Sequence, residues 1–204
     1  MSTRLGVGVE LLERSLAYTR VALAEVRPTS LTRRTPCARW DLGALLAHMD
    51  DALDAFLEAA GGSVAGGAAG SRPPSGPVDV AGLRDKACAL LGTWTVAASG
   101  AADPGGPAGT SGPRQDHERL VEVDGLPVLA DLLVSAAALE ITVHGWDVAT
   151  ALGLDHPLPD GLAEALLPVA RDVAPLGPFA APLPTPDDAP PGVRLLGLLG
   201  RSPA

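Results

Sequence analysis

The chain has 204 residues, of which 47% are apolar and 19% are charged, and its formal net charge is −9 with an isoelectric point near 4.8. A chain this acidic lacks the basic surface that sequence-independent binding of nucleic acid requires. Aromatic residues make up only 3% of the chain, whereas alanine and leucine are abundant. This composition favours packed helices over a β-sandwich, so we expect one mainly helical domain.

The sequence gives no sign of export or of a membrane anchor. Glu10 and Glu13 interrupt the N-terminal region, where a signal peptide needs an apolar run. No segment reaches ~18 consecutive uncharged apolar residues. The two cysteines, Cys37 and Cys88, lack the spacing of a disulfide or metal-binding framework. We therefore expect a soluble, cytoplasmic protein without disulfides.

Five segments carry apolar residues at helical spacing. In chain order they predict helices over residues 7–26, 42 to about 60, 79–98, 126–152 and 159–174. Thr19 fills the one gap in the apolar stripe of the first helix, and Asp41 suits the N-cap position of the second. Gly153 ends the longest pattern, as expected at the C-terminus of a helix.

The connections between these helices are long and rich in glycine and proline. Residues 61–78 and 99–116 read as surface loops, and residues 117–125 alternate enough to form a short strand. The fold class we predict is all-α: a four-helix bundle with long connections and one short extended segment. Residues 1–174 would form this bundle, and the proline-rich tail 175–204 would pack on it and end in one or two helical turns.

A carboxylate and an imidazole lie four residues apart in the segment LEITVHGWD. Residues at this spacing share one helix face with Cβ atoms ~6 Å apart, so Glu140 and His144 can point at one place. A polar pair on a solvated face is the usual explanation. Here the neighbours are apolar, which indicates burial. A buried carboxylate is costly unless it is paired or binds a metal.

A third candidate ligand lies in the second predicted helix. His48 has apolar neighbours, whereas His117 and His156 lie beside loops and should be exposed to solvent. His48 could be a core histidine that bonds to a backbone carbonyl or to Glu140. Alternatively, His48, Glu140 and His144 could converge inside the bundle. Three protein ligands with one open position are typical of a catalytic zinc site.

Three short motifs in this order resemble a known family. They are TPCARWDLGALLAHMDD at 35–51, VHGWDVATALG at 143–153 and PDDAPPGVRLLGLLGRSP at 186–203. They are similar to the TPC-x-x-W turn, the HGWD motif and the GR-x-P ending of an actinobacterial branch of the DinB-like superfamily. That branch is related to the N-terminal domain of mycothiol-dependent maleylpyruvate isomerase. The resemblance extends from about residue 30 to the C-terminus.

This resemblance implies a DinB-like four-helix bundle that binds a divalent metal, zinc most often and nickel in some members. The ligands of the isomerase branch match His48, Glu140 and His144. The isomerase itself has a further C-terminal domain that contributes an arginine to substrate binding. Here the tail after the bundle contains Arg194 and Arg201, neither of which can be equated with that arginine. The resemblance therefore leaves the substrate open.

Two aspartates repeat one spacing, because Asp51 follows His48 and Asp147 follows His144 by three residues. Either carboxylate could orient a metal-binding histidine or act as a catalytic base. The alternatives are a surface charge for Asp51 and a structural hydrogen bond to a loop for Asp147.

Four other side chains could lie near the site. Trp40 and Trp146 are expected in the core or in a pocket wall. Cys37 is expected to be a small buried apolar residue rather than a ligand or redox group. Tyr18, the only tyrosine, could line the pocket.

Two classes of function follow. In the first, zinc activates a small thiol, by resemblance mycothiol, for S-transfer to an electrophilic substrate or for its isomerisation; a variant uses zinc-bound water for hydrolysis. In the second, the three ligands only hold together a non-catalytic metal- or ligand-binding bundle. Partners would be small molecules in either case, and the protein would be a monomer or a homodimer.

Overall fold

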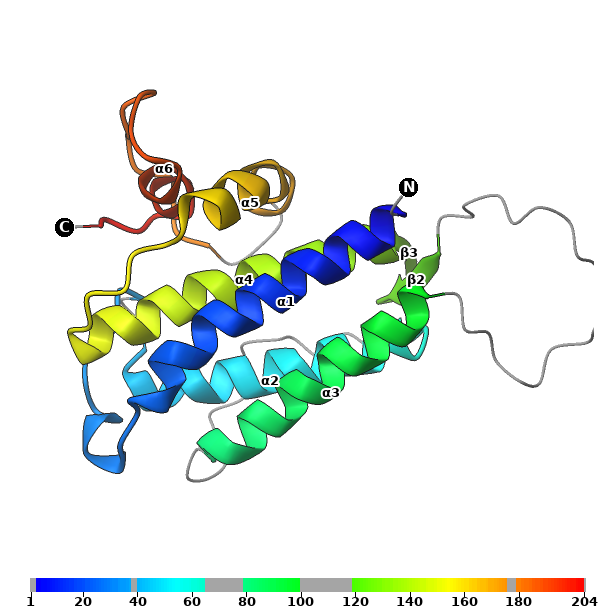
Figure 1. Cartoon of the computed structure of the whole chain (residues 1–204), viewed down its shortest axis with the longest axis horizontal. Coiled ribbons are helices and arrows are strands. Elements are labelled where there is room, and N and C mark those ends of the chain that lie inside the picture. Colours follow the sequence, from blue (N-terminus) through cyan, green and yellow to red (C-terminus); the bar gives the residue numbers. More distant parts are fainter. Residues whose placement is uncertain (1–2, 38–39, 65–78, 100–118, 176–178, 204) are drawn as a thin grey trace, which may run out of the picture.

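The computed structural model describes residues 3–37, 40–64, 79–99, 119–175 and 179–203. These residues confirm the predicted, mainly helical fold class (Figure 1). Six α-helices carry the structure: α1 (Arg4–Ala24), α2 (Leu42–Ala60), α3 (Val80–Ala98), α4 (Ala130–Leu152), α5 (Asp160–Val173) and α6 (Pro191–Leu198). Short elements connect them: the 3-10 turn η1 (Pro28–Ser30) and the strands β1 (Ser63–Val64), β2 (Leu120–Val123) and β3 (Leu126–Leu129).

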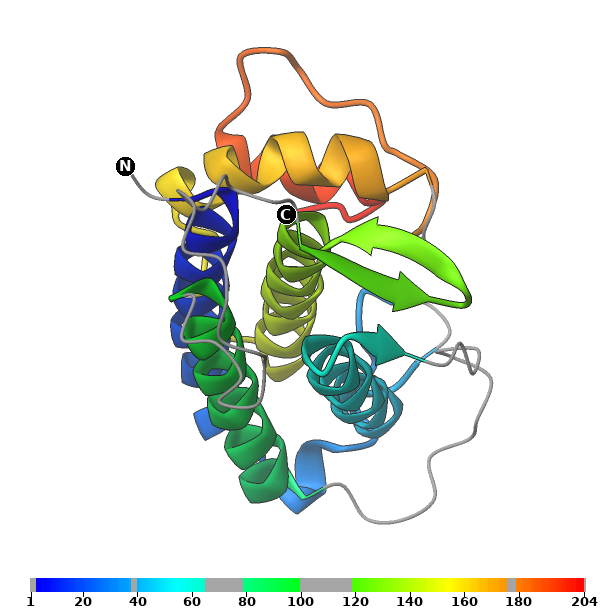
Figure 2. The same ribbon diagram turned by 90° about the vertical axis from the view of Figure 1, so that its right-hand side faces the viewer.

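The four long helices form a bundle in which each helix contacts two neighbours. α1 packs against α4 and α3, and α2 packs against α3 and α4 (Figures 1 and 2). Each helix sends large side chains into one shared core, and several are fully buried: Leu12, Leu45, Leu90, Trp94 and Leu139. Burial of each such side chain stabilises the fold by about 1.5–3 kcal/mol relative to exposure. Each helix is therefore stabilised by packing against the others.

Helix α4 is apolar on most sides because it lies against several other elements. Every residue from Ala137 to Ala149 is buried except Glu140, which is partly buried. By length and composition α4 is the one helix among the described residues that could cross a membrane, but 67% of its apolar window is buried inside the protein. That burial is typical of a core helix. Its end at Gly153, which has φ +73°, confirms the predicted stop.

The predicted helix over 126–152 is wrong in its first four residues. Leu126–Leu129 forms β3, which pairs antiparallel with β2, and β1 runs parallel to β2 on its other edge. Asp124 and Gly125, both with positive φ, make the turn of this hairpin. Pairing with β2 satisfies the backbone of 126–129, so the helix begins only at Ala130. The extended segment expected within 117–125 is confirmed at β2.

Side chains at the N-cap positions set where two of the helices begin. Thr3 accepts a hydrogen bond from the Gly6 backbone N–H, so α1 begins before the predicted residue 7. Asp41 is the N-cap of α2, as predicted, and accepts from the Ala44 N–H at 2.9 Å. Most of the two predicted Gly/Pro-rich loops, and His117, lie outside the described residues.

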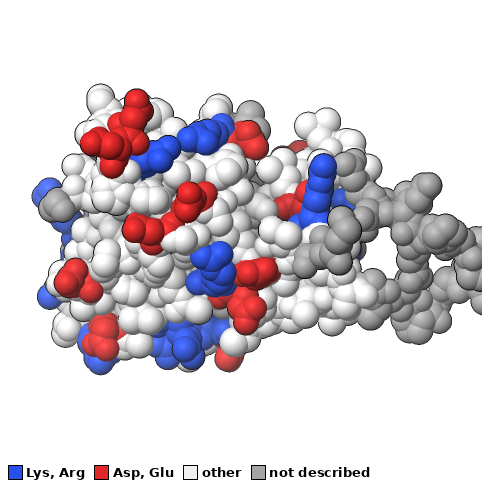
Figure 3. Space-filling model, turned by 45° about the horizontal axis from the view of Figure 1, so that its top comes forward, with Lys and Arg blue, Asp and Glu red and all other residues white. Residues whose placement is uncertain are grey.

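The C-terminal part of the chain returns to the bundle. α5 packs against α6 and lies on the side formed by α1 and α4 (Figure 1). The chain after α6 then runs to Arg201, whose side chain is buried against α4. On the face shown in Figure 3, acidic and basic side chains lie in small groups of both signs, separated by uncharged surface.

Candidate metal centre

The three side chains expected to bind metal lie together between α2 and α4. Glu140 Oε2 is 3.0 Å from Nε2 of His144 and 4.0 Å from Nε2 of His48. One ligand atom from each residue can be chosen so that all three lie within 4.8 Å of one another. Helical spacing aligns Glu140 with His144, and the packing of α2 on α4 adds His48.

This arrangement suits a divalent cation. Two imidazole nitrogens and a carboxylate oxygen form a donor set typical of zinc, and ligands ~2.1 Å from one tetrahedral ion are about 3.4 Å apart. The distances from Glu140 to the two histidines, 3.0 and 4.0 Å, bracket that value. At 4.0 Å, His48 and Glu140 are too far apart for a hydrogen bond. The residues therefore fit a metal with only small side-chain shifts.

Burial and charge separate the pKa values of these groups. Burial and the nearby His144 lower the pKa of His48. Burial would raise the pKa of Glu140, but its hydrogen bond and charge interaction with His144 outweigh this, and the pKa is lowered. Burial would lower the pKa of His144, but hydrogen bonds to Asp147 and Glu140 raise the pKa to about 9. One positive charge therefore lies between two carboxylates.

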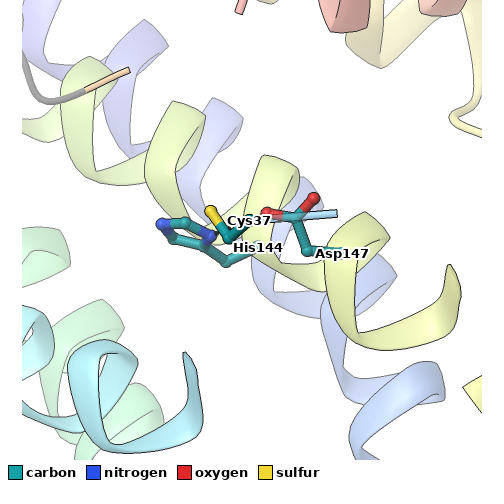
Figure 4. Close-up of side chains that lie close together, drawn as sticks. All are labelled: Cys37, His144 and Asp147. Carbon is teal, nitrogen blue, oxygen red and sulfur yellow. Dashed lines mark hydrogen bonds and ion pairs between the residues drawn. The ribbon is translucent and has the colours of Figure 1, made fainter. Parts of the chain in front are cut away.

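The second ring nitrogen of His144 has a different set of partners. Its Nδ1 is 3.0 Å from Oδ2 of Asp147, which is fully buried (Figure 4). Nη2 of Arg201 donates to the same oxygen at 2.9 Å, and Nη1 donates to the Leu199 carbonyl at 2.7 Å. A hydrogen bond that the ring N–H donates to a buried carboxylate fixes the orientation of a metal-binding histidine. Asp147 and Arg201 provide such support.

Cys37 completes this network. Its sulfur accepts a hydrogen bond from Arg201 Nη2 at 3.2 Å, and it lies beside Asp147 and His144 (Figure 4). Burial and the negative charge of Asp147 raise the pKa of the Cys37 thiol to about 11, so the thiol is protonated at neutral pH. Cys37, Asp147 and Arg201 therefore form one hydrogen-bonded group on the Nδ1 side of His144.

Two cavities meet at the ligands. The smaller, of about 640 Å³, is lined by Trp40, His48, Arg201 and the tail residues Phe179 and Ala180, and also contains Glu140 and His144. The larger, of about 910 Å³, is lined by residues of α1, α2 and α3 and also contains Glu140 and His144. Trp40 walls the smaller cavity, as expected, with its ring centroid 4.5 Å from that of His48.

The remaining candidates lie elsewhere. Asp51 is exposed, and Trp146 is a core residue with 9% exposure. Tyr18 lines neither cavity; it stacks on His156 at 4.2 Å and donates to the His156 carbonyl. The expectation that His156 is exposed is wrong, because this stacking leaves it half-buried.

Helix α1 contacts α4 most closely beside the site. Thr19, which interrupts the apolar stripe of α1, is buried and donates to the Ile141 carbonyl at 2.7 Å. A Cβ on Gly145 would collide with the Thr19 hydroxyl. A glycine directly after His144 therefore permits the helix contact that holds this turn of α4.

Sequence reasoning gave no role to Arg201 or Phe179. Arg201 lies against the Phe179 ring, with Cζ 5.8 Å from the ring centroid. A signal for Arg201 was present, because a buried aspartate in an apolar helix needs a cationic partner and the GR-x-P ending supplies an arginine. No comparable signal marks Phe179.

The chain was compared with known proteins and families. The family model described as "Mycothiol maleylpyruvate isomerase N-terminal domain" matches residues 12–149. Two uncharacterized proteins, from two strains of Mycobacterium tuberculosis, are 29% identical to the chain over 186 residues, covering 88% of this chain and 90% of each relative. No solved structure matches the chain.

Proposed function

We propose, from the premise that the chain belongs to the mycothiol maleylpyruvate isomerase N-terminal domain family, that it is a metal-dependent enzyme acting on a small thiol. The family indicates a DinB-like metal-binding protein related to mycothiol. The thiol, mycothiol by family relationship, would be activated for S-transfer to a small electrophile or for isomerisation of it. We place this reaction in the cytoplasm.

The proposed ligands are His48, Glu140 and His144, with zinc preferred and nickel as the alternative. The donor set and the 3.0 and 4.0 Å separations support this choice. Asp147 would keep Nδ1 of His144 protonated, which leaves Nε2 free to bind the metal.

The observation that carries the proposal is that two cavities reach the same ligands. Structural zinc sites are closed by four protein ligands, whereas catalytic sites keep a position for water or substrate. Three protein donors beside two cavities fit the second kind. The same observation argues against a non-catalytic bundle in which the ligands only hold the helices together.

Each part of the site would have its own task. When bound, the metal would supply positive charge that favours the thiolate form of the thiol substrate. The smaller cavity would hold the polar thiol, because Arg201 and His48 offer polar contacts and Trp40 offers a flat wall. The thiol would lose its proton to solvent, and its sulfur would bond to the electrophilic carbon as that carbon loses either a leaving group, in S-transfer, or its π bond to a neighbouring carbon, in isomerisation. Glu140 and His144, shared by both cavities, would fix where the two molecules meet.

Metal content and thiol binding test this proposal separately. We expect about one zinc or nickel per chain in the purified protein, and loss of that metal in His48→Ala, because two remaining ligands hold it poorly. Asp51→Ala, a change at an exposed position three residues away, is the control and should retain the metal. Metal retained by His48→Ala, or absent from the wild type, would contradict the ligand assignment.

The thiol is then tested on cobalt-substituted protein. Mycothiol should change the visible absorption of the cobalt site, because sulfur enters its coordination sphere. An unchanged spectrum at saturating mycothiol would favour water as the nucleophile, and hydrolysis of a small substrate would become the leading alternative.

A further inference from the structure

The larger cavity has an apolar lining that the metal centre alone does not require. It is a groove between α1 and α3, which lie side by side in Figure 2, with α2 and α4 beneath. Its volume of about 910 Å³ is within the range of small-molecule sites. The walls are aliphatic and aromatic side chains: Leu16, Val21, Leu53, Phe56, Ala87 and Leu91.

Small side chains keep this groove open. Four alanines line it, Ala17 and Ala24 on α1, Ala52 on α2 and Ala87 on α3, at positions where larger side chains would fill the space. One wall residue, Val21, is 53% exposed although it is apolar. Exposed apolar surface inside a concave groove is typical of a ligand site.

Charge at the groove selects against ionic ligands. The charged residues along it are exposed and balanced in sign, with Glu13 and Glu25 against Arg20 and Arg84. A small dicarboxylate would find no excess of cations there, and the walls between these charged residues and the floor at Glu140 and His144 are mainly apolar. An uncharged, mainly hydrocarbon molecule would gain free energy from burial along the walls.

The groove is continuous with the metal centre. Glu140 and His144 form part of its floor, and the same two residues face the smaller, more polar cavity. A molecule lying in the groove therefore reaches these two residues without passing Trp40 or Arg201, which line only the smaller cavity. This continuity favours a small molecule that ends at the metal over a protein segment that covers the surface.

We propose that the groove between α1 and α3 binds the uncharged, apolar body of the electrophilic substrate, whose reactive end lies at Glu140 and His144. This inference rests on the proposed function and specifies its substrate class. The thiol and the electrophile approach the ligands through different cavities, and the preferred electrophile is an apolar compound rather than a small dicarboxylate.

The first test examines the groove without metal. The neutral fluorescent probe N-phenyl-1-naphthylamine should bind the metal-free wild type and become bright. Ala87→Trp fills the groove from α3 and should abolish this binding, whereas Ala89→Trp, an exposed position of the same helix outside both cavities, should not. Ala17→Trp blocks the opposite wall from an exposed position, and circular dichroism checks that each variant is folded.

The second test links the groove to the metal. Straight-chain alkyl hydroxamates can ligate zinc at one end and place their chain in the groove. Their affinity for zinc-loaded wild type and Ala89→Trp should rise about fourfold per methylene group. In Ala87→Trp and Ala17→Trp the affinity should not depend on chain length, while zinc content stays at the wild-type level.

The outcomes separate the two proposals. Failure of the wild type to bind the naphthylamine probe, or hydroxamate affinity that is independent of chain length, would overturn the groove assignment even if zinc is bound. Absence of zinc from protein that binds the probe in an Ala87→Trp-sensitive manner would instead contradict the proposed function and the end point of the substrate at the metal.

Discussion

The two ring nitrogens of His144 face opposite kinds of surroundings. On the Nδ1 side, Asp147 is fully buried and Arg201 is 5% exposed, and hydrogen bonds of 2.9–3.0 Å join the three residues. On the Nε2 side, Glu140 and His48 are 4.0 Å apart, and two cavities share Glu140 and His144 in their linings. We call the Nδ1 side, with Asp147 and Arg201, the closed side, and the Nε2 side, with Glu140 and His48, the open side.

This difference indicates which side supports the site and which side binds. A buried, paired ionic network holds a side chain in one orientation. On the Nε2 side Glu140 is 3.0 Å from His144 and 4.0 Å from His48, so an ion would hold the three ligands at an intermediate spacing. Variants on the closed side should therefore act first on stability and only indirectly on metal binding.

The largest expected effect comes from removing the carboxylate of the closed side. Asp147→Ala leaves Arg201 buried without its charge partner, and breaking a buried pair in this way costs about 3–5 kcal/mol. We expect a loss of this size in the free energy of unfolding in urea. Asp51→Ala, which has the same spacing from the other histidine but is exposed, should change it by less than about 0.5 kcal/mol.

If Asp147→Ala and Asp51→Ala lowered the free energy of unfolding equally, the two carboxylates would be equivalent. This result would contradict the difference between the closed side and an exposed position. The double variant Asp147→Asn with Arg201→Gln serves as a further check. It removes both charges while keeping hydrogen-bonding groups, so it should be more stable than Asp147→Ala.

A smaller effect is expected from the arginine of the tail. Arg201→Gln removes the charge that holds Asp147, and loss of such outer partners typically lowers metal affinity 10–100-fold. Competition with a chromophoric zinc chelator measures this. Arg194→Gln, an arginine of the same tail that lines neither cavity, should keep wild-type affinity. If both variants bind zinc equally, Arg201 is a structural link of the tail and does not position His144.

The open side could be predicted from the sequence more fully than the closed side. Glu140 and His144 follow from helical spacing, and their burial follows from apolar neighbours. Convergence of His48 with these two residues was one alternative from the sequence, and the family resemblance supported it. Periodicity alone does not show which helices are adjacent. The contact between Asp147 and Arg201 joins residues 54 positions apart and depends on the path of the tail, which no local pattern encodes.

The fold shows the same division between local and long-range information. Helix α2 begins at the predicted cap Asp41, because capping is a local interaction. The start of α4 was predicted four residues too early, because the apolar run Leu126–Leu129 suits a helix or a strand equally. The positive φ values at Asp124 and Gly125 and the pairing with β2 decide for the strand.

A last expected effect, of about tenfold per pH unit, is a pH dependence that arises on the open side. Hydrogen bonds to Asp147 and Glu140 outweigh burial and raise the pKa of His144 to about 9, so the metal-free protein holds a proton on this ring at pH 7. The pKa of His48 is lowered, so His48 is already neutral there. A histidine must be neutral at the nitrogen that binds a metal. Zinc therefore displaces the proton at Nε2 of His144.

Because zinc displaces this proton, zinc affinity should increase as pH rises. Below pH 9 zinc competes with a single proton on His144, so zinc affinity should rise about tenfold per pH unit from pH 7 and level off near pH 9. Calorimetry at pH 7.5 in buffers of different ionisation enthalpy should detect close to one proton released per zinc. In Asp147→Asn one of the two raising carboxylates is lost, so affinity should level off at a lower pH. No proton release from the wild type would mean that His144 is neutral before zinc binds. In that case Asp147 would not keep a second proton on the His144 ring.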